Sequence, residues 1–392
     1  MLDATCVSFI YLQGNKACKV RKKVVTKDGI LTHYNVNNQG AQLQLFALFS
    51  ELKARGINPK VITFTKSYEF ADKDADKRNN ISIRSIPYIL KNYLLKRGIG
   101  SCWHNFIKYQ KHKTFLSKHL ELCTPAEKYD TVFVGSDEVF SVVEGYNGIM
   151  FGEGINAERM IAYAPSFGQT DIRLIEERGY AEKIAEGLQK YTSLSARDKK
   201  TKEMIYELCG RTADLVIDPV LLHKFDLESV KIRTPKKKYL VVYSYDRNMN
   251  KPEEIEKIKS FAKRNGLLTV SAGTYHKWCD KNIPCNCLEW LYIFANSSFV
   301  ITDTFHGTIA SVITNKPVAI LTRPNINSNK LENLIDTLGI TSRKLNPNFE
   351  NLENLYTEEM DYQHINDRVE SLREASATYL DNSLKKRTKG TV

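Results

Sequence analysis

The sequence predicts an α/β protein with two Rossmann-like domains that face one another across a cleft. Three observations support this prediction. Short apolar runs alternate with segments of helical periodicity along most of the 392 residues. The alternation stops at a polar connection, "KIRTPKKK" at 231–238, and then restarts. A chain of this length can bury two sizeable cores, so we expect an N-terminal domain over 28–230 and a C-terminal domain over 231–350.

The first domain begins with a β-α-β unit. "GILTHYN" from residue 29 predicts a strand and a loop, 40–56 has helical periodicity, and "KVITF" from residue 60 predicts the next strand. Four later runs, "YDTVFVGSDEVF", "MIAYAPSFG", "YTSLSARD" and "DLVIDPVLL", predict further strands, and 171–190 has helical spacing. These elements together predict a parallel sheet covered by helices.

Each of these apolar runs ends in small or polar residues. The carboxyl ends of parallel strands meet at one edge of the sheet, and open α/β sheets bind their ligands at that edge. We therefore expect a ligand site where the following residues gather: Gly135, Ser136, Asp137, Ser166, Gly168, Arg197, Asp198 and Asp218.

The second domain repeats the alternation. Strands are predicted in "YLVVYSY", "LLTVSA", "FVITD" and "PVAIL", and helices over 252–265, over 288–296 and in "GTIASVITN". Outside the two domains, 1–27 is expected to be an N-terminal extension. We expect 351–392 to form a C-terminal helix that packs back on the first domain and ends in a basic tail.

The net charge of +12 indicates anionic partners of some kind. The most basic stretch of the chain is a predicted helical insert at about 91–120. It has seven Lys or Arg, no acidic residue, and interleaved aromatic residues. Two interpretations of this insert stay open. It is either the solvated basic face of ordinary helices or a surface that meets anionic lipid or nucleic acid.

Other function classes are excluded or disfavoured by what the sequence lacks. The eight cysteines do not have the paired spacing of a disulfide scaffold, and four zinc ligands at finger spacing are absent, so no metal site is expected. The apolar run "CVSFIYL" is too short to span a membrane and follows Asp3 where a signal peptide has basic residues. We expect a cytoplasmic protein, with or without peripheral contact at the inner face of the membrane.

His306 is the first candidate for chemistry, because it stands where a predicted strand passes into a predicted helix, in "VITDTFHGTIASVITNKP". The amides of Gly307 and Thr308 at such a helix start would favour an anion, and the hydroxyls of Thr304 and Thr308 add donors. Asp303 would orient the imidazole or cap the helix. The alternative is a histidine buried between sheet and helix, and three residues alone leave both interpretations open.

Further candidates lie in the first domain. The guanidinium of Arg197, at the end of "YTSLSARD", could hold a carboxylate or phosphate with two hydrogen bonds. Ser136 and Asp137 in "GSDEVF" could supply a donor and a base, or could only cap a helix. Residues of the predicted cleft complete the set: Asn38, Gly40, Ser136 and Ser166.

Six blocks in order make the chain resemble the polysaccharide pyruvyl transferase family. They are "NNQGAQLQLFAL", "YDTVFVGSDEVF", "YAPSFG", "LSARDKKT", "LVIDPVLL" and "VITDTFHGTIASVITNKP", and the resemblance covers roughly 28–345. It implies a glycosyltransferase B-like fold. It also implies transfer of pyruvate from phosphoenolpyruvate to two hydroxyls of a sugar in a capsular or exopolysaccharide precursor, with formation of a ketal and release of phosphate.

The resemblance also implies roles for the candidate residues. His306 would be the general acid or contact the leaving group, and Arg197 with the Gly307 and Thr308 amides would hold the anionic groups of the donor. Thr304 and Lys330 would contribute to donor binding, with Lys330 where the family often has arginine. Asp137 would orient or deprotonate a sugar hydroxyl. No cofactor is implied beyond phosphoenolpyruvate as co-substrate, and the acceptor is expected to be a lipid-linked oligosaccharide.

Two competing functions remain. One is a nucleotide-sugar-dependent glycosyltransferase of the same architecture. The other is a binding module for a membrane surface or nucleic acid that uses 91–120. The sequence has no recognised RNA or DNA motif, so no nucleic-acid partner is expected.

Overall fold

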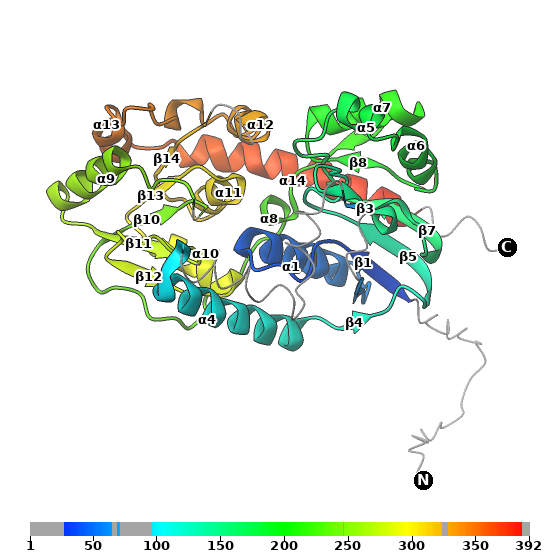
Figure 1. Ribbon diagram of the computed structural model, residues 1–392, viewed down its shortest axis with the longest axis horizontal. Coiled ribbons are helices and arrows are strands. Elements are labelled where there is room, and N and C mark those ends of the chain that lie inside the picture. The colour runs from blue at the N-terminus through cyan, green and yellow to red at the C-terminus, as the bar shows by residue number, and fades with distance from the viewer. Residues whose placement is uncertain (1–26, 65–68, 71–95, 246, 324–327, 386–392) are drawn as a thin grey trace, which may run out of the picture.

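Two parallel sheets, each covered by helices, lie side by side in the computed structural model (Figure 1). The structure describes residues 27–64, 69–70, 96–245, 247–323 and 328–385. The predicted extension over 1–27 therefore lies almost wholly outside the described residues, as does the basic tail beyond residue 385.

The sheet of the first domain has the strand order β4-β2-β1-β5-β7. Its central strands are buried on both faces, because helices cover both sides of a parallel sheet. The strands are β1 (Asp28–Leu31), β2 (Lys60–Ile62), β4 (Leu122–Cys123), β5 (Lys128–Val134) and β7 (Asn156–Ala162). The helices are α1 (Gln39–Ala54), α4 (Lys96–His119), α5 (Ile172–Glu177), α6 (Ala181–Gln189), α7 (Lys199–Cys209) and α8 (Pro219–Leu222).

Shorter elements complete the first domain. The two-residue strands β8 (Ser195–Ala196) and β9 (Asp214–Leu215) pair in parallel. They are the short strands predicted in "YTSLSARD" and "DLVIDPVLL", and the second ends early because Pro219 starts α8 within that run. In addition, β3 (Glu69–Phe70) pairs with β6 (Gly145–Tyr146), which precedes the 3-10 helix η3 (Gly148–Phe151).

The sheet of the second domain has the order β12-β11-β10-β13-β14. Its strands are β10 (Tyr239–Tyr243), β11 (Leu268–Ala272), β12 (Lys281–Ile283), β13 (Phe299–Thr302) and β14 (Val318–Ile320). Its helices are α9 (Pro252–Arg264), α10 (Cys287–Ala295), α11 (Phe305–Ile313), α12 (Ser328–Leu338), η4 (Thr341–Arg343) and α13 (Leu352–Thr357). The two predicted Rossmann-like units are therefore present.

The last helix, α14 (Tyr362–Lys385), returns to the first domain as predicted (Figure 1). The Tyr379 hydroxyl donates to the carbonyl of Ala162 at 2.7 Å, and Asp381 pairs with Arg55 at 2.7 Å. Ser376 accepts a hydrogen bond from the amide of Ile217 at 3.0 Å. This helix therefore ties the chain end to the sheet edge that carries the ligand site.

Strand order places a crevice in each domain. After β1 the chain moves to β2 on one side, and β5 later joins on the other side; β10 stands in the same way between β11 and β13. Such switch points are where open parallel sheets bind ligands. Helix α1 follows β1 and α11 follows β13, so both helices start at these crevices.

Helix α1 lies between the two domains. It is buried nearly all round, and the Gln39 side chain donates to the Gly273 carbonyl of the second domain at 3.0 Å. One hydrophobic core continues from Ile30 and Leu48 in the first domain to Tyr243 and Trp290 in the second. The apolar character of "GAQLQLFALF" on more than one face follows from this double burial.

Candidate active site

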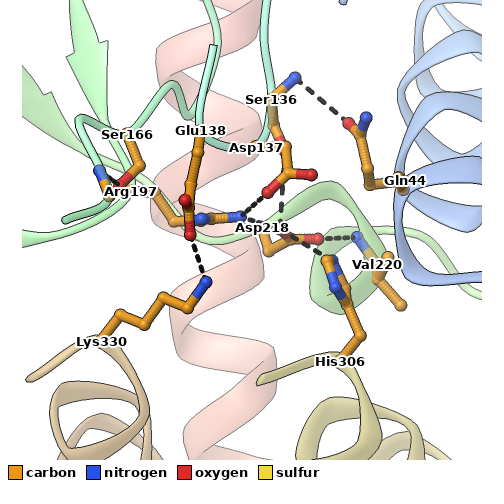
Figure 2. Close-up of polar contacts among 12 residues, drawn as sticks. Gln44, Ser136, Asp137, Glu138, Ser166, Arg197, Asp218, Val220, His306 and Lys330 are labelled. Carbon is orange, nitrogen blue, oxygen red and sulfur yellow. Dashed lines mark hydrogen bonds and ion pairs between the residues drawn. The ribbon is translucent and has the colours of Figure 1, made fainter. Parts of the chain in front are cut away.

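The cleft between the domains has a volume of about 430 Å³ and is lined by five of the predicted site residues, from both domains. Its walls come from the ends of β1, β5 and β8 in the first domain and from the starts of α11 and α12 in the second. Figure 2 shows how the central polar residues converge there from both domains. The polar and charged lining residues are His33, Asn38, Asp137, Glu138, Ser141, Glu144, Gln169, Arg197, Tyr245, His306 and Lys330.

His306 reaches into the cleft from the first turn of α11. The helix begins at Phe305, because the Thr304 side chain caps it by accepting from the Gly307 amide at 3.0 Å. The His306 Nε2 atom lies 3.6 Å from Asp218 Oδ2, which is an ion-pair distance and too long for a hydrogen bond. This buried Nε2 has no hydrogen-bond partner within the described part of the chain. His306 is therefore held in place with a ring nitrogen still available to a ligand.

Gly40 provides the space for the His306 ring. A Cβ atom on Gly40 would lie 2.3 Å from His306 Nδ1 and 2.7 Å from His306 Cβ, far inside van der Waals contact. Because the His306 Cβ is fixed to the α11 backbone, the ring could not move away without moving the helix. Gly40, predicted as a cleft residue, thus acts by letting α1 approach the histidine.

We expect Gly40→Ala to lower turnover at least about tenfold through displacement of the ring. An alanine inside a helix is otherwise more favourable than glycine by about 1 kcal/mol, so a loss of stability would report the clash itself. The measurement is turnover together with the free energy of unfolding. In a His306→Gly background the ring and its Cβ are both gone, and there Gly40→Ala should stabilise the protein. Destabilisation in both backgrounds would contradict the contact.

Arg197 joins the two carboxylates of the site. Its Nη1 lies 3.1 Å from Asp218 Oδ2 and 3.4 Å from Asp137 Oδ1. The guanidinium also stacks over the Phe305 ring, 4.6 Å from its centroid, so the first turn of α11 contacts it as well. Its Nη2 is buried and has no hydrogen-bond partner among the described residues. Arg197 therefore brings a donor without a partner to the floor of the cleft.

The charges of this cluster stabilise one another. Burial raises the pKa of the Asp137 carboxyl, but the charges of Arg197, His306 and Lys330 outweigh burial and hold that pKa well below its ordinary value. The pKa of Asp218 is lowered in the same way, since its burial is outweighed by His306 and Arg197. Burial lowers the pKa of Arg197, yet the two carboxylates raise it overall. Both carboxylates are thus ionised, which makes Asp137 a weak base and favours an orienting role.

Asp218 is a central residue that the sequence did not single out. It is completely buried, accepts from the Val220 amide at 2.9 Å, and contacts both Arg197 and His306. The signal was its position at the end of "DLVIDPVLL", among the residues expected at the ligand-binding edge. Only the Oδ1 atom of Asp218 caps α8, by accepting from the Val220 amide, whereas its Oδ2 atom faces Arg197 and His306.

Lys330 closes the cleft from α12 through an ion pair with Glu138 of the first domain (Figure 2). Burial lowers the pKa of Lys330, but Glu138 raises it overall, so the ammonium is charged. Asn38 also lines the cleft, and its side-chain oxygen caps α1 by accepting from Ala41 at 3.1 Å. The structure thus brings together His306, Arg197, Asp137, Lys330 and Asn38 in one cleft.

Other predicted site residues serve the fold instead. The Gly307 amide is bonded to Thr304 Oγ1 and the Thr308 amide to the Thr304 carbonyl, so neither amide is available to an anion. The Thr308 hydroxyl also donates to the Thr304 carbonyl, at 3.0 Å. These groups and Thr304 are thus engaged in hydrogen bonds within α11, which caps itself, and the prediction that they bind the donor stays a prediction.

Three more residues depart from their predicted places. The Ser166 hydroxyl donates to Asp198 at 2.7 Å, and that of Ser136 faces Asp218 at 3.5 Å; both serines are buried and neither lines the cleft. Asp303 does not orient His306, because its oxygens accept from Ser244, Asn248 and Arg323. The polar contacts of Asp303 thus all lie within the second domain, among the described residues.

No group of three or more His, Cys, Asp or Glu side chains in the described ranges could hold a metal ion. Within the same ranges, no helix has both the length and the apolar character needed to cross a bilayer.

Solved structures show the class of fold. UGT89C1 of Arabidopsis thaliana, solved with UDP-L-rhamnose, is 9% identical with a TM-score of 0.51, over 92% of this chain and 99% of that chain. The glycosyltransferase SnogD of Streptomyces nogalater is 10% identical with a TM-score of 0.43, over 92% and 98%. A putative UDP-N-acetylglucosamine 2-epimerase of Listeria monocytogenes is 11% identical with a TM-score of 0.47, over 94% and 98%. The likeness to UGT89C1, together with the two parallel sheets, shows a glycosyltransferase B-like fold.

Within this class of fold, a family model identifies the chain more closely. The model described as polysaccharide pyruvyl transferase matches residues 38–325, which include every residue of the central cluster except Lys330. The chain belongs to the polysaccharide pyruvyl transferase family. A search of curated protein sequences finds no significant match.

Proposed function

We propose that this protein transfers pyruvate from phosphoenolpyruvate to two hydroxyls of a sugar, forming a ketal in the precursor of a capsular or other surface polysaccharide. One observation carries the proposal beyond the family. Two buried nitrogen atoms of the cleft, Arg197 Nη2 and His306 Nε2, have no hydrogen-bond partner among the residues that the structure describes, and they lie on opposite domains. A small, strongly anionic donor satisfies both atoms.

The reaction needs a proton donor and anion-binding groups. A proton adds to the methylene carbon of phosphoenolpyruvate and turns it into a methyl group, which makes the adjacent carbon electrophilic. Two sugar oxygens bond to that carbon in turn, and the carbon–oxygen bond to phosphate breaks. Of the two hydroxyl protons released, one replaces the proton used on the methylene carbon and the other leaves with hydrogen phosphate. Atoms and charge therefore balance without a cofactor.

The residues of the cleft fit these tasks. His306 supplies the proton to the methylene carbon or to the departing phosphate, and Asp218 holds its ring in place. Arg197 binds the carboxylate or the phosphate of the donor, and Lys330 adds a second positive charge from α12. Asp137, ionised and partly exposed to the cleft, accepts a hydrogen bond from a sugar hydroxyl. Thr304, Gly307 and Thr308 have no part in donor binding in this proposal.

Turnover with defined acceptors tests the proposal. Purified protein is incubated with phosphoenolpyruvate and a panel of lipid-linked and short soluble oligosaccharides. We expect phosphate release and a product heavier than the acceptor by one pyruvic acid minus one water. Folded protein that forms no ketal on any acceptor of a broad panel would overturn the proposal.

Donor binding can be measured without knowing the acceptor. A ligand that binds only the folded state stabilises it by about 2.7 kcal/mol at roughly 100 times its Kd. We expect phosphoenolpyruvate to raise the melting temperature, and Arg197→Lys to reduce this shift because lysine lacks the planar fork. The melting temperature is also measured with uridine diphosphate and with guanosine diphosphate for comparison. A shift with a nucleoside diphosphate and none with phosphoenolpyruvate would instead favour a nucleotide-sugar glycosyltransferase.

A further inference from the structure

Helix α4 has two opposite faces of very different character. Its inner face is held by both domains: the Phe115 ring packs against Phe46 with 5.3 Å between centroids, and Lys111 pairs with Glu289 at 2.9 Å. His104 packs against Tyr275 of the second domain, with 5.6 Å between ring centroids. The outer face is exposed to solvent, along the lower edge of the molecule in Figure 1.

Large apolar side chains are concentrated on this outer face. Four of the nine exposed large hydrophobic residues in the described chain lie on α4: Ile99 at 79%, Trp103 at 64%, Phe106 at 53% and Tyr109 at 43% exposure. They follow one another every three or four residues after Gly98, whose positive φ interrupts the helix, so they form a single stripe. The Trp103 and Phe106 rings stack with 5.9 Å between centroids. We call these four residues the aromatic stripe.

Positive charge continues from the aromatic stripe along the same helix. Lys113, four residues after Tyr109, is exposed on the same face, and Lys118 is exposed further along the helix. Within α4 there are six Lys or Arg and no acidic residue. An apolar stripe followed by cations, on a helix anchored by its other face, is the pattern of an element that lies in the interface of an anionic bilayer.

We propose that α4 docks this protein on an anionic membrane surface, with the aromatic stripe inserted among the lipid head groups and Lys113 and Lys118 beside the lipid phosphates. The proposal concerns a partner of the protein and stands apart from the reaction proposed for the cleft. It assigns a function to the basic insert that the active site does not use.

The size of the aromatic stripe favours a membrane over a second protein. The exposed parts of its four side chains amount to about 500 Å², whereas each partner in a stable protein interface buries roughly 800 Å². Insertion into a bilayer interface needs only a few aromatic anchors. For single-stranded nucleic acid the cations would be expected beside the stacking rings, but Lys113 and Lys118, the exposed lysines among the described side chains of α4, lie beyond the aromatic stripe.

The position of α4 connects the membrane to the cleft. The Asn37 side chain donates to the carbonyl of Asn105 on α4 at 3.3 Å. Asn37 lies between Val36 and Asn38, which both line the cleft. A helix at the lipid surface would thus hold one wall of the cleft near the bilayer, where the sugar of a lipid-linked acceptor is found.

Vesicle binding of the full chain tests the proposal. The probes are vesicles of phosphatidylcholine alone and of phosphatidylcholine with phosphatidylglycerol, measured by co-flotation. We expect binding to the anionic vesicles only, reduced about tenfold or more in W103S/F106S, because the apolar contacts are lost. K113Q/K118Q should weaken it by about fivefold for each lysine removed. The matched control is Tyr206→Ser, which removes an aromatic side chain of 61% exposure from α7.

Tryptophan emission gives a second measurement. Trp290 is fully buried and Trp278 is partly buried, so a blue shift on adding anionic vesicles would come from Trp103 and should vanish in the W103S variant. Equal vesicle binding by wild type and W103S/F106S would overturn the proposal. So would a stable dimer that buries the aromatic stripe, or an RNA that binds through the same residues more tightly than the vesicles do.

The test of the docking surface does not depend on whether the proposed reaction takes place. Vesicle binding needs no turnover, so a protein without ketal-forming activity can still support or overturn the docking surface. Where the reaction is observed, W103S/F106S should keep its turnover on a short soluble acceptor and lose turnover on an acceptor embedded in anionic vesicles. Equal turnover on both acceptors would contradict the docking surface alone.

Discussion

His306→Gln is expected to remove turnover while leaving the protein folded. Loss of a general acid slows an enzyme by about 10² to 10⁴, and glutamine keeps a polar group of similar length beside Asp218. The His306 side chain is 13% exposed and its Nε2 has no hydrogen-bond partner among the described residues, so the fold loses little when the ring is replaced. Phosphate release and the melting temperature are the two measurements.

The matched control for this variant is His364→Gln. His364 is exposed on α14, away from the cleft, and its replacement should alter neither turnover nor stability. If His306→Gln unfolded the protein while activity per folded molecule persisted, the histidine would be a core residue and the acid would have to lie elsewhere.

The fold was largely predictable from the sequence because both domains obey simple periodicity. Buried parallel strands such as 132–134 appear as continuous apolar runs, and helices of period 3.6 separate them. The prediction was weakest in "DLVIDPVLL", which looks like one strand. There the capping aspartate and the following proline start a helix after only two paired residues.

The site was predictable only in part. Arg197 and His306 could be named because charged or titratable residues at strand ends and helix starts point to a cleft. The amides of Gly307 and Thr308 could not be excluded, because the sequence does not reveal that Thr304 caps its own helix. Asp218 was expected at the ligand-binding edge but was given no role of its own, because a position before Pro219 is explained by helix capping. Only the packing of the two domains shows its second oxygen facing Arg197 and His306.

Arg197→Met is expected to be the most destabilising single change in the cleft. It leaves Asp218 and Asp137 as neighbouring carboxylates without their shared cation, and removing one partner of a buried ion pair costs about 3–5 kcal/mol. Donor binding should also be lost, since the guanidinium proposed to hold the donor is gone and the two remaining carboxylates repel an anion. Urea unfolding and the phosphoenolpyruvate-dependent melting shift measure the two effects.

The pH dependence of this variant distinguishes a charge effect from simple loss of packing. In the wild-type protein both carboxyls have a pKa below the ordinary value of 3.8. Their contribution to stability is therefore present above that value and is lost as the pH falls through the lowered pKa. Without Arg197, burial dominates and raises these pKa values, so the folded state binds protons more readily than the unfolded state does.

The sign of the pH dependence then reverses in Arg197→Met. Stability is gained as the pH falls toward the raised carboxyl pKa and is lost again as the pH rises. Lys330, which also faces Asp137, stays charged throughout this range. We expect the stability gap between the variant and wild type to be widest near pH 8 and to narrow toward about pH 5. Adding Asp218→Asn to the variant should recover stability at high pH. A gap that is the same at every pH, with no recovery in the double variant, would mean that Arg197 acts by filling space against Phe305 and not by its charge.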